Sequence, residues 1–246
     1  MAALLVFTLG ANAETRAYAK KTFKAQDGFE LPYQVLYPEN FDPTTQYPLL
    51  VFLHGSGERG DDNSLQTFHG GEMLASAPEL EQVIVIVPQC PIYDTWAPKN
   101  SSDDGNREFP YKAPMRSPLK AVKELMDNMI SLGFVNTDRI YGTGLSLGGF
   151  GILDFALRFP DFFAAVQPIC GGTNIQRCEE YKGRTAFRFF HGLEDTAVAP
   201  ENSIKGNEAL QKAGAHSELV TYPGVKHGSW YNAFKEPDFL SWMLKY

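Results

Sequence analysis

The feature of this 246-residue chain that most limits its fold is a series of six short apolar segments, each ending in glycine, proline or a polar turn. They are YPLLVFLHG, VIVIVPQ, RIYGTG, FFAAVQPI, TAFRFFHG and SELVTYPG. Continuous apolar runs of this length are typical of strands that are covered on both faces. We therefore expect these segments to form the centre of a mainly parallel sheet.

Amphipathic segments separate the apolar runs. Residues 117–133, SPLKAVKELMDNMISLG, place Leu and Met side chains at helical spacing, with Ser117 as the expected N-cap and Pro118 in the first turn. Residues 201–214 and 236–246 follow the same pattern. Strands that alternate with helices predict right-handed crossovers and an α/β fold with helices on both faces of the sheet.

The chain is expected to form one domain. Before the apolar runs, KTFKAQ and LPYQVLYP flank the turn-forming pair Asp27-Gly28, a pattern that predicts an antiparallel hairpin. We find no internal repeat, low-complexity tract or linker, so we predict a single domain over 20–246 without a large cap domain. The net charge of −7 disfavours nucleic acid and anionic lipid as partners.

The first 13 residues, 1–13, resemble an export signal. An apolar run from Ala2 to Leu9 precedes the small-residue triplet Ala11-Asn12-Ala13, a pattern that predicts a signal peptide and a secreted or periplasmic protein. No Lys or Arg precedes the run, so a truncated start or a buried first strand is the alternative. A run of about eight apolar residues is too short to span a bilayer as a helix, so no stable membrane insertion is expected.

Three cysteines, Cys90, Cys170 and Cys178, allow one disulfide and leave one thiol over. In an oxidising compartment Cys170 and Cys178 could close a short loop, although Cys90 could equally be a partner because spacing does not determine connectivity. Neither spacing nor neighbouring residues indicate a zinc site. No metal or organic cofactor is expected.

The segment YGTGLSLGG places Ser146 where an apolar strand passes into a helical segment. Gly144 and Gly148, two residues to either side, remove side chains that would collide in so tight a turn. The hydroxyl of Ser146 would then stand above the sheet at a helix N-terminus, with the Leu147 amide free to donate to an oxyanion. The pattern predicts a serine nucleophile at the carboxyl ends of the strands.

A serine nucleophile needs a histidine base and a carboxylate that orients the base. FRFFHGLEDTAV places Glu194 and Asp195 just after a strand, and TYPGVKHGSW places His227 in a loop after the last strand. We prefer Asp195 to Glu194, because the reach of the carboxylate must match the short loop that holds the histidine. His216 also follows the acid, but it lies at the amino end of its strand, so His227 is the predicted base.

The other histidines are expected to be structural. His54 and His191 each precede a glycine at a strand end, where the ring nitrogens would hold loops by hydrogen bonds. His69 lies in an upstream loop.

A second oxyanion donor should come from the loop LHGSGERG, residues 53–60. Gly55 and Gly57 allow the backbone to turn its amides inward, and the Ser56 N–H is the candidate donor. Ser56 has no tight turn around it, which argues against a second nucleophile. We expect Arg59 and the two aspartates that follow to stabilise a turn rather than to bind substrate.

With these motifs the chain resembles the α/β-hydrolase superfamily, and within it the secreted carboxylesterase/phospholipase-like and feruloyl-esterase-like serine esterases. The motifs that carry the resemblance are FLHGSGERGDDN, VPQCP, DRIYGTGLSLGG, HGLEDTAV and YPGVKHGSW. The resemblance covers the chain from about residue 30 onward. It implies the α/β-hydrolase fold, the triad Ser146, Asp195 and His227, and oxyanion donors at the backbone amides of Ser56 and Leu147.

The segment after VPQCP departs from the shortest members of that group, because it runs for about 25 residues without periodicity, and loops of that length are usually functional. It follows a strand's carboxyl end, so Tyr93 and Trp96 could line the substrate pocket. Phe109 and Tyr111 could form a partial lid over the site. The alternative is a surface loop held in place by its aromatic residues.

These observations together predict a secreted serine esterase that hydrolyses carboxylic esters through an acyl-enzyme. The expected partner is a short-chain ester or an acyl or feruloyl ester linked to polysaccharide. Two alternatives stay open: a serine peptidase that resembles the catalytic domain of prolyl oligopeptidases, and a non-catalytic polymer-binding protein on a hydrolase scaffold. Peptide-amide substrates and a fluorophosphonate probe would separate the three.

Overall fold

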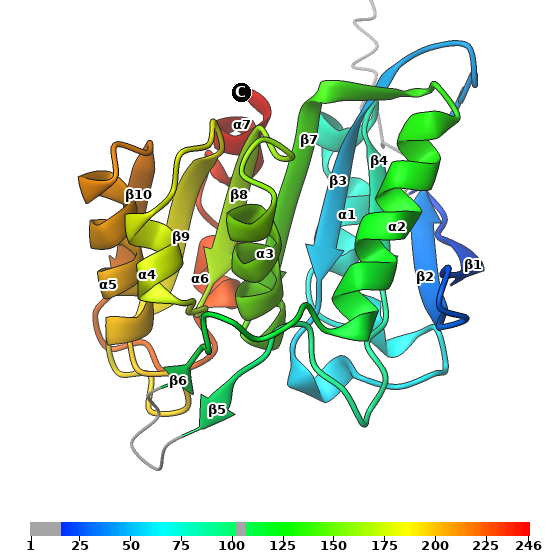
Figure 1. Ribbon diagram of the computed structural model, residues 1–246. Coiled ribbons are helices and arrows are strands. Elements are labelled where there is room, and N and C mark those ends of the chain that lie inside the picture. The colour runs from blue at the N-terminus through cyan, green and yellow to red at the C-terminus, as the bar shows by residue number, and fades with distance from the viewer. Residues whose placement is uncertain (1–15, 102–106) are drawn as a thin grey trace, which may run out of the picture.

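A computed structural model describes residues 16–101 and 107–246; residues 1–13, the predicted signal peptide, lie outside these ranges. An eight-stranded sheet in the order β1-β2-β4-β3-β7-β8-β9-β10 forms the centre of the molecule (Figure 1). Its strands are β1 (Ala19–Lys24), β2 (Glu30–Leu36), β3 (Tyr47–Leu53), β4 (Ile84–Pro88), β7 (Val135–Leu145), β8 (Ala165–Ile169), β9 (Ala186–Gly192) and β10 (Ser217–Tyr222). Strand β2 is antiparallel to β1 and β4, and all other neighbours are parallel. The predicted parallel sheet with an antiparallel N-terminal hairpin is confirmed.

Helices cover both faces of this sheet. They are α1 (Gly71–Ser76), α2 (Ser117–Ser131), α3 (Leu147–Arg158), α4 (Ile175–Glu179), α5 (Glu201–Lys212), α6 (Trp230–Ala233) and α7 (Phe239–Leu244). Figure 1 shows α2 to α5 in front of the sheet and α1, α6 and α7 behind it. The short hairpin of β5 (Asn100–Ser101) and β6 (Arg107–Glu108) lies at the lower edge, toward which β3 points. Within the described ranges, none of the helices has both the length and the apolar character needed to cross a membrane.

Strand β3 shows why the apolar runs are continuous. Leu49, Val51 and Leu53 pack into the core in front of the sheet, with side chains of α2 and α3. Leu50 and Phe52 pack into a second core behind it, with side chains of α1 and α7. Successive strand residues point to opposite faces, so a strand between two helix layers must be apolar at every position.

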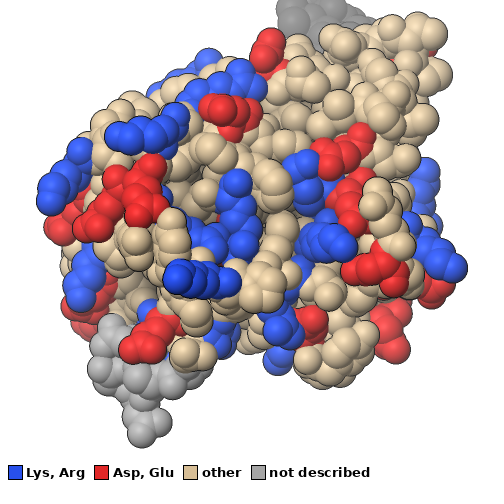
Figure 2. Space-filling view, viewed as in Figure 1, with Lys and Arg blue, Asp and Glu red and all other residues tan. Residues whose placement is uncertain are grey.

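Charged side chains of both signs are spread over one face of the molecule (Figure 2). On the face shown in Figure 2, acidic and basic side chains are interspersed. The net charge of −7 therefore forms no continuous negative field on that face.

The three cysteines are buried free thiols, so the disulfide that the spacing allowed between Cys170 and Cys178 is absent. The physical reason is the sheet itself. Cys178 belongs to the core in front of it and Cys170 to the core behind it. Burial raises the pKa of both thiols to about 12, which keeps them protonated and unreactive at neutral pH.

Two element boundaries differ from the sequence-based expectation. Strand β7 begins at Val135, ahead of the apolar segment RIYGTG. Helix α2 begins at Ser117, and its N-cap is Arg116, whose backbone is extended. The predicted N-cap role of Ser117 is therefore wrong by one position: no side chain caps this helix.

Gly148 offers a direct test of the close packing between α3 and β3. A Cβ atom on Gly148 would lie 1.8 Å from the Leu53 carbonyl oxygen, whereas one on Gly206 in α5 would meet Phe189 at an ordinary 3.6 Å. We expect Gly148→Ala to destabilise the fold by about 1–3 kcal/mol or more. Gly206→Ala should stabilise it by about 0.5–1 kcal/mol through helix propensity. Urea unfolding of both variants measures this, and equal midpoints for Gly148→Ala and the unaltered protein would contradict the close approach.

Candidate active site

The turn between β7 and α3 places Ser146 in a conformation that few non-glycine residues adopt. Its backbone has φ 52° and ψ −112°. The Ser146 N–H donates to the Ile169 carbonyl at 2.9 Å, and its carbonyl accepts the Phe150 N–H at 3.0 Å. A Cβ atom on Gly144 would lie 2.6 Å from the Gly148 carbonyl oxygen. Hydrogen bonds on both sides and close backbone contacts thus hold the strained turn that the glycine pattern predicted.

The structure brings Ser146, His227 and Asp195 together. His227 Nε2 lies 2.9 Å from Ser146 Oγ, and His227 Nδ1 lies 2.7 Å from Asp195 Oδ2. The other Asp195 oxygen, Oδ1, accepts the N–H groups of Ala197 and Val198, each at 2.9 Å. The three side chains come from the ends of β7, β9 and β10, which lie at one edge of the parallel sheet.

The electrostatics of this group are dominated by Asp195. Burial acts to raise the pKa of Asp195, but hydrogen bonds from His191, His227 and the Val198 N–H outweigh it and hold the pKa well below 3.8. An ionised carboxylate beside Nδ1 favours the His227 tautomer with its proton on that nitrogen. The Nε2 lone pair then faces Ser146 Oγ, so the imidazole is placed to accept the hydroxyl proton.

The competing acid and base lie elsewhere. Glu194 is exposed, and its backbone N–H donates to the Val225 carbonyl at 2.9 Å. His216 is also exposed, precedes β10 and lies 3.0 Å from a Glu218 oxygen. It is therefore at the opposite edge of the sheet from Ser146.

Two further histidines support the site. His54 is buried, its Nδ1 lies 2.6 Å from the Gly55 carbonyl, and its Nε2 accepts the Cys90 N–H at 3.0 Å. Burial lowers the pKa of His54 to about 4, so the ring is neutral and holds two loops. This is the structural role that the sequence predicted.

His191 does more than the sequence indicated. It does hold loops: its Nδ1 lies 2.7 Å from Ser203 Oγ and its Nε2 3.0 Å from the Val198 carbonyl. The same Nε2 lies 3.3 Å from Asp195 Oδ2, with both side chains fully buried. Asp195 is thus held between two histidines. The only signal in the sequence was the position of His191 at the end of the strand that precedes Asp195.

The two predicted oxyanion donors line the same pocket as Ser146 and His227. Ser56 is the first residue of the short helix η1 (Ser56–Glu58), and Leu147 is the first residue of α3. The first N–H groups of a helix have no partner within it, and neither amide has an acceptor among the described residues. Both are therefore free to bind an oxygen atom in the pocket.

This pocket has a volume of about 260 Å³. Neither Tyr93 nor Trp96 lines it, which corrects the sequence-based expectation. Trp96 is fully buried, and its Nε1 donates to the His54 carbonyl at 3.1 Å. Tyr93 is 80% exposed and is not among the residues that line the pocket. Between them, Thr95 lines the pocket instead.

The described parts of the segment 92–116 are tied to the body of the protein. The Phe109 ring packs edge-on against Phe150 with 5.2 Å between centroids, and Asn174 donates to the Phe109 carbonyl at 2.6 Å. Arg177 donates to the Tyr111 carbonyl at 2.5 Å. These contacts support the alternative of a stapled surface loop over that of a lid.

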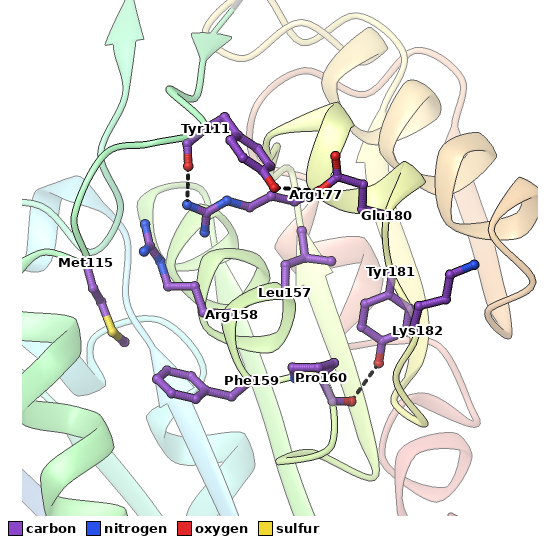
Figure 3. A pocket seen from close by; sticks show the side chains of 10 residues that line it. All are labelled: Tyr111, Met115, Leu157, Arg158, Phe159, Pro160, Arg177, Glu180, Tyr181 and Lys182. Carbon is purple, nitrogen blue, oxygen red and sulfur yellow. Dashed lines mark hydrogen bonds between the residues drawn. The ribbon is translucent and has the colours of Figure 1, made fainter.

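A larger pocket of about 550 Å³ lies away from Ser146, beside α3 and α4 (Figure 3). Its polar side chains are engaged with the protein: Tyr111 donates to Glu180 at 2.5 Å and Tyr181 to the Pro160 carbonyl at 2.9 Å. Among residues 16–101 and 107–246, no serine, cysteine or histidine lines it. The smaller pocket is therefore the candidate active site.

One group of potential metal ligands occurs at the site. Ligand atoms of Cys170, Asp195 and His227 lie within 4.8 Å of one another. Both His227 nitrogens, however, are hydrogen-bonded to Ser146 and Asp195, and the Cys170 thiol stays protonated because burial raises its pKa to about 12. These residues fit the proton-transfer arrangement better than a metal centre.

Comparison with known proteins agrees with the fold. Residues 172–246 match the model of the prolyl oligopeptidase family. A probable carboxylesterase of Oryza sativa subsp. japonica is 24% identical over 196 residues, which are 74% of this chain and 81% of the relative. A probable feruloyl esterase C of Aspergillus terreus is 25% identical over 201 residues, 80% of this chain and 67% of the relative.

Among solved structures, a thermostable esterase is 31% identical and superposes with a TM-score of 0.82 over 93% of this chain. This chain spans 62% of the length of that esterase. The sheet order, the strained turn at Ser146 and these similarities show that the chain has the α/β-hydrolase fold and resembles esterases with that fold. It is a hydrolase.

The hydrogen bonds to Asp195 predict a pH-dependent stability. Because its pKa in the folded protein lies below 3.8, ionised Asp195 stabilises the fold above about pH 4, and this contribution is lost as the pH falls further. We expect Asp195→Asn to lower the free energy of unfolding at pH 7, with a difference from the unaltered protein that shrinks below pH 4. Denaturant unfolding at several pH values measures it.

The control is Glu194→Gln, which removes an exposed neighbouring carboxylate. Its stability profile should follow that of the unaltered protein. A constant difference between Asp195→Asn and the unaltered protein from pH 7 to pH 3 would contradict the lowered pKa of Asp195.

Proposed function

We propose that the protein is a serine esterase that hydrolyses carboxylic esters through an acyl-enzyme. The observation that carries the proposal is the continuous hydrogen-bond chain from Ser146 through His227 to Asp195, with two unpartnered amides in the same pocket. Each group that ester hydrolysis requires is within reach of a substrate bound there.

The reaction follows from this geometry. His227 Nε2 accepts the Ser146 proton as Oγ attacks the ester carbonyl carbon, and Asp195 stabilises the resulting imidazolium. The amides of Ser56 and Leu147 donate to the carbonyl oxygen as it becomes an oxyanion. The imidazolium then protonates the departing alkoxide, which leaves an acyl group on Ser146. Water attacks the acyl group with His227 again as the base, which releases the carboxylic acid and restores the serine.

The size of the pocket suits a single short or aromatic acyl group better than a long lipid chain. Its volume of about 260 Å³ lies just below the range of about 300–1,000 Å³ that is typical of small-molecule sites. Short-chain esters, and acyl or feruloyl esters attached to polysaccharide, are the substrates we propose. The names of the carboxylesterase and feruloyl esterase relatives are consistent with this range of substrates.

A serine peptidase is the second candidate, favoured by the match of residues 172–246 to the prolyl oligopeptidase family. It uses the same chemistry, except that the leaving amine must be protonated before it can depart. A non-catalytic polymer-binding role is disfavoured by the aligned hydrogen bonds of Ser146 and His227.

Export of the protein is a further proposal. It is supported by the sequence of residues 1–13, with its apolar run and its triplet Ala11-Asn12-Ala13. We propose a secreted or periplasmic enzyme that acts on a small-molecule or polymer-linked ester.

Removal of the Ser146 hydroxyl tests the esterase. We expect Ser146→Ala to lower kcat for a short 4-nitrophenyl ester by at least about a thousandfold, because no other group can form the acyl-enzyme. Ser56→Ala should lose far less, since it keeps the backbone amide that we assign to the oxyanion. Steady-state kinetics measures kcat of both variants, and circular dichroism checks that they fold. Comparable losses would refute the distinction between the two serines.

A fluorophosphonate probe gives an independent readout. We expect it to label the unaltered protein at Ser146 and to leave folded Ser146→Ala unlabelled, as mass spectrometry of the labelled peptide would show. A folded protein that the probe does not label would favour the non-catalytic reading.

Esters and amides with the same acyl group separate the two enzymatic candidates. We expect kcat/KM for the ester to exceed that for the peptide amide by orders of magnitude, measured on matched pairs. Similar values for the two would favour a peptidase.

A further inference from the structure

The candidate active-site pocket is lined by three positively charged side chains, Arg59, Lys99 and Arg107. No Asp or Glu of the described ranges lines it. The whole chain carries a net charge of −7, so the positive charge of the described residues in this lining runs against the composition. The ester hydrolysis proposed above uses none of the three side chains.

Arg59 is held in place by neutral partners. Its Nε donates to the Ser56 carbonyl at 3.0 Å, and its Nη1 donates to the carbonyls of Ile92 and Asp94, each at 3.1 Å. The expected turn-stabilising role is thus present, but the partners are carbonyl groups and not the neighbouring aspartates. Among the described residues Nη2 has no acceptor. The half-buried guanidinium of Arg59 therefore has no acidic partner among the described residues, and its two Nη2 N–H groups are available to a ligand in the pocket.

Lys99 is the least compensated of the three. It is half-buried, and within the described ranges its ammonium group has neither an ion pair nor a hydrogen bond. Burial lowers the pKa of Lys99, and the charges of Arg107 and Arg59 lower it further. Asp94 is nearby in the sequence, but its carboxylate is bonded to Arg116 at 2.5 Å and to the Thr95 N–H at 2.7 Å. A partly buried cation without a counter-charge is costly for the protein.

Arg107 adds a third positive charge from β6. Its backbone N–H lies 3.4 Å from Asn202 Oδ1, and its Nη2 donates to the Ala197 carbonyl at 2.6 Å. Ala197 also binds Asp195 through its N–H, so the Arg107 guanidinium is anchored beside the loop that carries the candidate triad acid.

We propose that this pocket binds a negatively charged group of the substrate, so that the preferred substrates are esters carrying a carboxylate close to the scissile bond. The proposal rests on the esterase function proposed above and specifies its substrate class. An anionic group within hydrogen-bond distance of Lys99 Nζ and Arg59 Nη2 would supply a counter-charge that no described residue supplies to these two groups. Charge-assisted hydrogen bonds of this kind are stronger than neutral ones.

Matched pairs of esters test the proposal. For a charge on the acyl side, mono(4-nitrophenyl) adipate is compared with 4-nitrophenyl heptanoate, which has an ethyl group in place of the carboxylate. For a charge on the alcohol side, 4-acetoxybenzoate is compared with 4-acetoxybenzamide. The measured quantity is the ratio of kcat/KM for the charged and neutral member, after subtraction of uncatalysed hydrolysis. We expect one pair to favour the charged ester by about tenfold or more, with a ratio that falls as salt is added.

Lys99 variants show whether the preference comes from the pocket. Lys99→Met should lower the charged-to-neutral ratio about tenfold, and Lys99→Arg should keep most of it because the positive charge remains. Lys112→Met removes the same charge from an exposed position that does not line the pocket, and its ratio should match that of the unaltered protein. Arg59 is left intact, since it also holds the Ser56 carbonyl.

The two proposals fail in different ways. Hydrolysis that depends on Ser146, with ratios near one in both pairs, would overturn the anionic substrate and keep the esterase. A protein that hydrolyses no ester would overturn the esterase. The pocket is then judged by calorimetric titration of adipate into Ser146→Ala: binding that Lys99→Met abolishes would support an anion site, and no binding would overturn it.

Discussion

The close approach of α3 to the strand ends is the constraint on which the rest of the site depends. Only the absent side chains of Gly144 and Gly148 allow backbone atoms of α3, β7 and β3 to meet at these distances. The contact forces Ser146 to a positive φ and directs its hydroxyl to the carboxyl edge of the sheet. It also leaves the Leu147 amide at the helix start without a hydrogen-bond acceptor among the residues that the structure describes. The candidate nucleophile and one candidate oxyanion donor are thus both positioned by one packing contact.

The charges of the site are arranged around that contact. Asp195 is buried and accepts hydrogen bonds from two backbone amides and lies between two histidines, so it stays ionised where an unsolvated carboxylate would otherwise be costly. His191 and His227 share this carboxylate, but only His227 reaches Ser146. The difference between the structural His191, in β9, and the candidate catalytic His227, in the loop after β10, is therefore set by position in the fold and not by the chemistry of the side chain.

Among the described residues, the pocket lined by Ser146 and His227 carries three basic side chains and no acidic one. The interspersed charges on the face in Figure 2 and the acidic composition give no hint of it. It arises because Arg59 follows η1, Lys99 precedes β5 and Arg107 lies in β6, three points that only the folded chain brings to one cavity. A site with charge opposite to that of its protein can attract an anionic substrate that the rest of the surface repels.

Much of the fold and the centre of the site could be predicted from the sequence, because both depend on local rules. Strands between two helix layers read as continuous apolar runs, and a strand-turn-helix with glycines around Ser146 has one consistent geometry. Asp195 and His227 followed from chain order and from the edge of the sheet at which their loops emerge. The backbone amides of Ser56 and Leu147 followed from the same two turns.

What the sequence could not determine depends on contacts between distant segments. The sheet separates Cys170 from Cys178. Trp96 is fully buried and Tyr93 is exposed, and the pocket is lined instead by Thr95 and Lys99 from the same segment. An irregular segment has no periodicity from which the direction of a side chain can be read. The sequence by itself determined the chemistry of the site, and only the tertiary structure decided what surrounds it, because pocket walls are built from side chains whose orientation long-range packing alone selects.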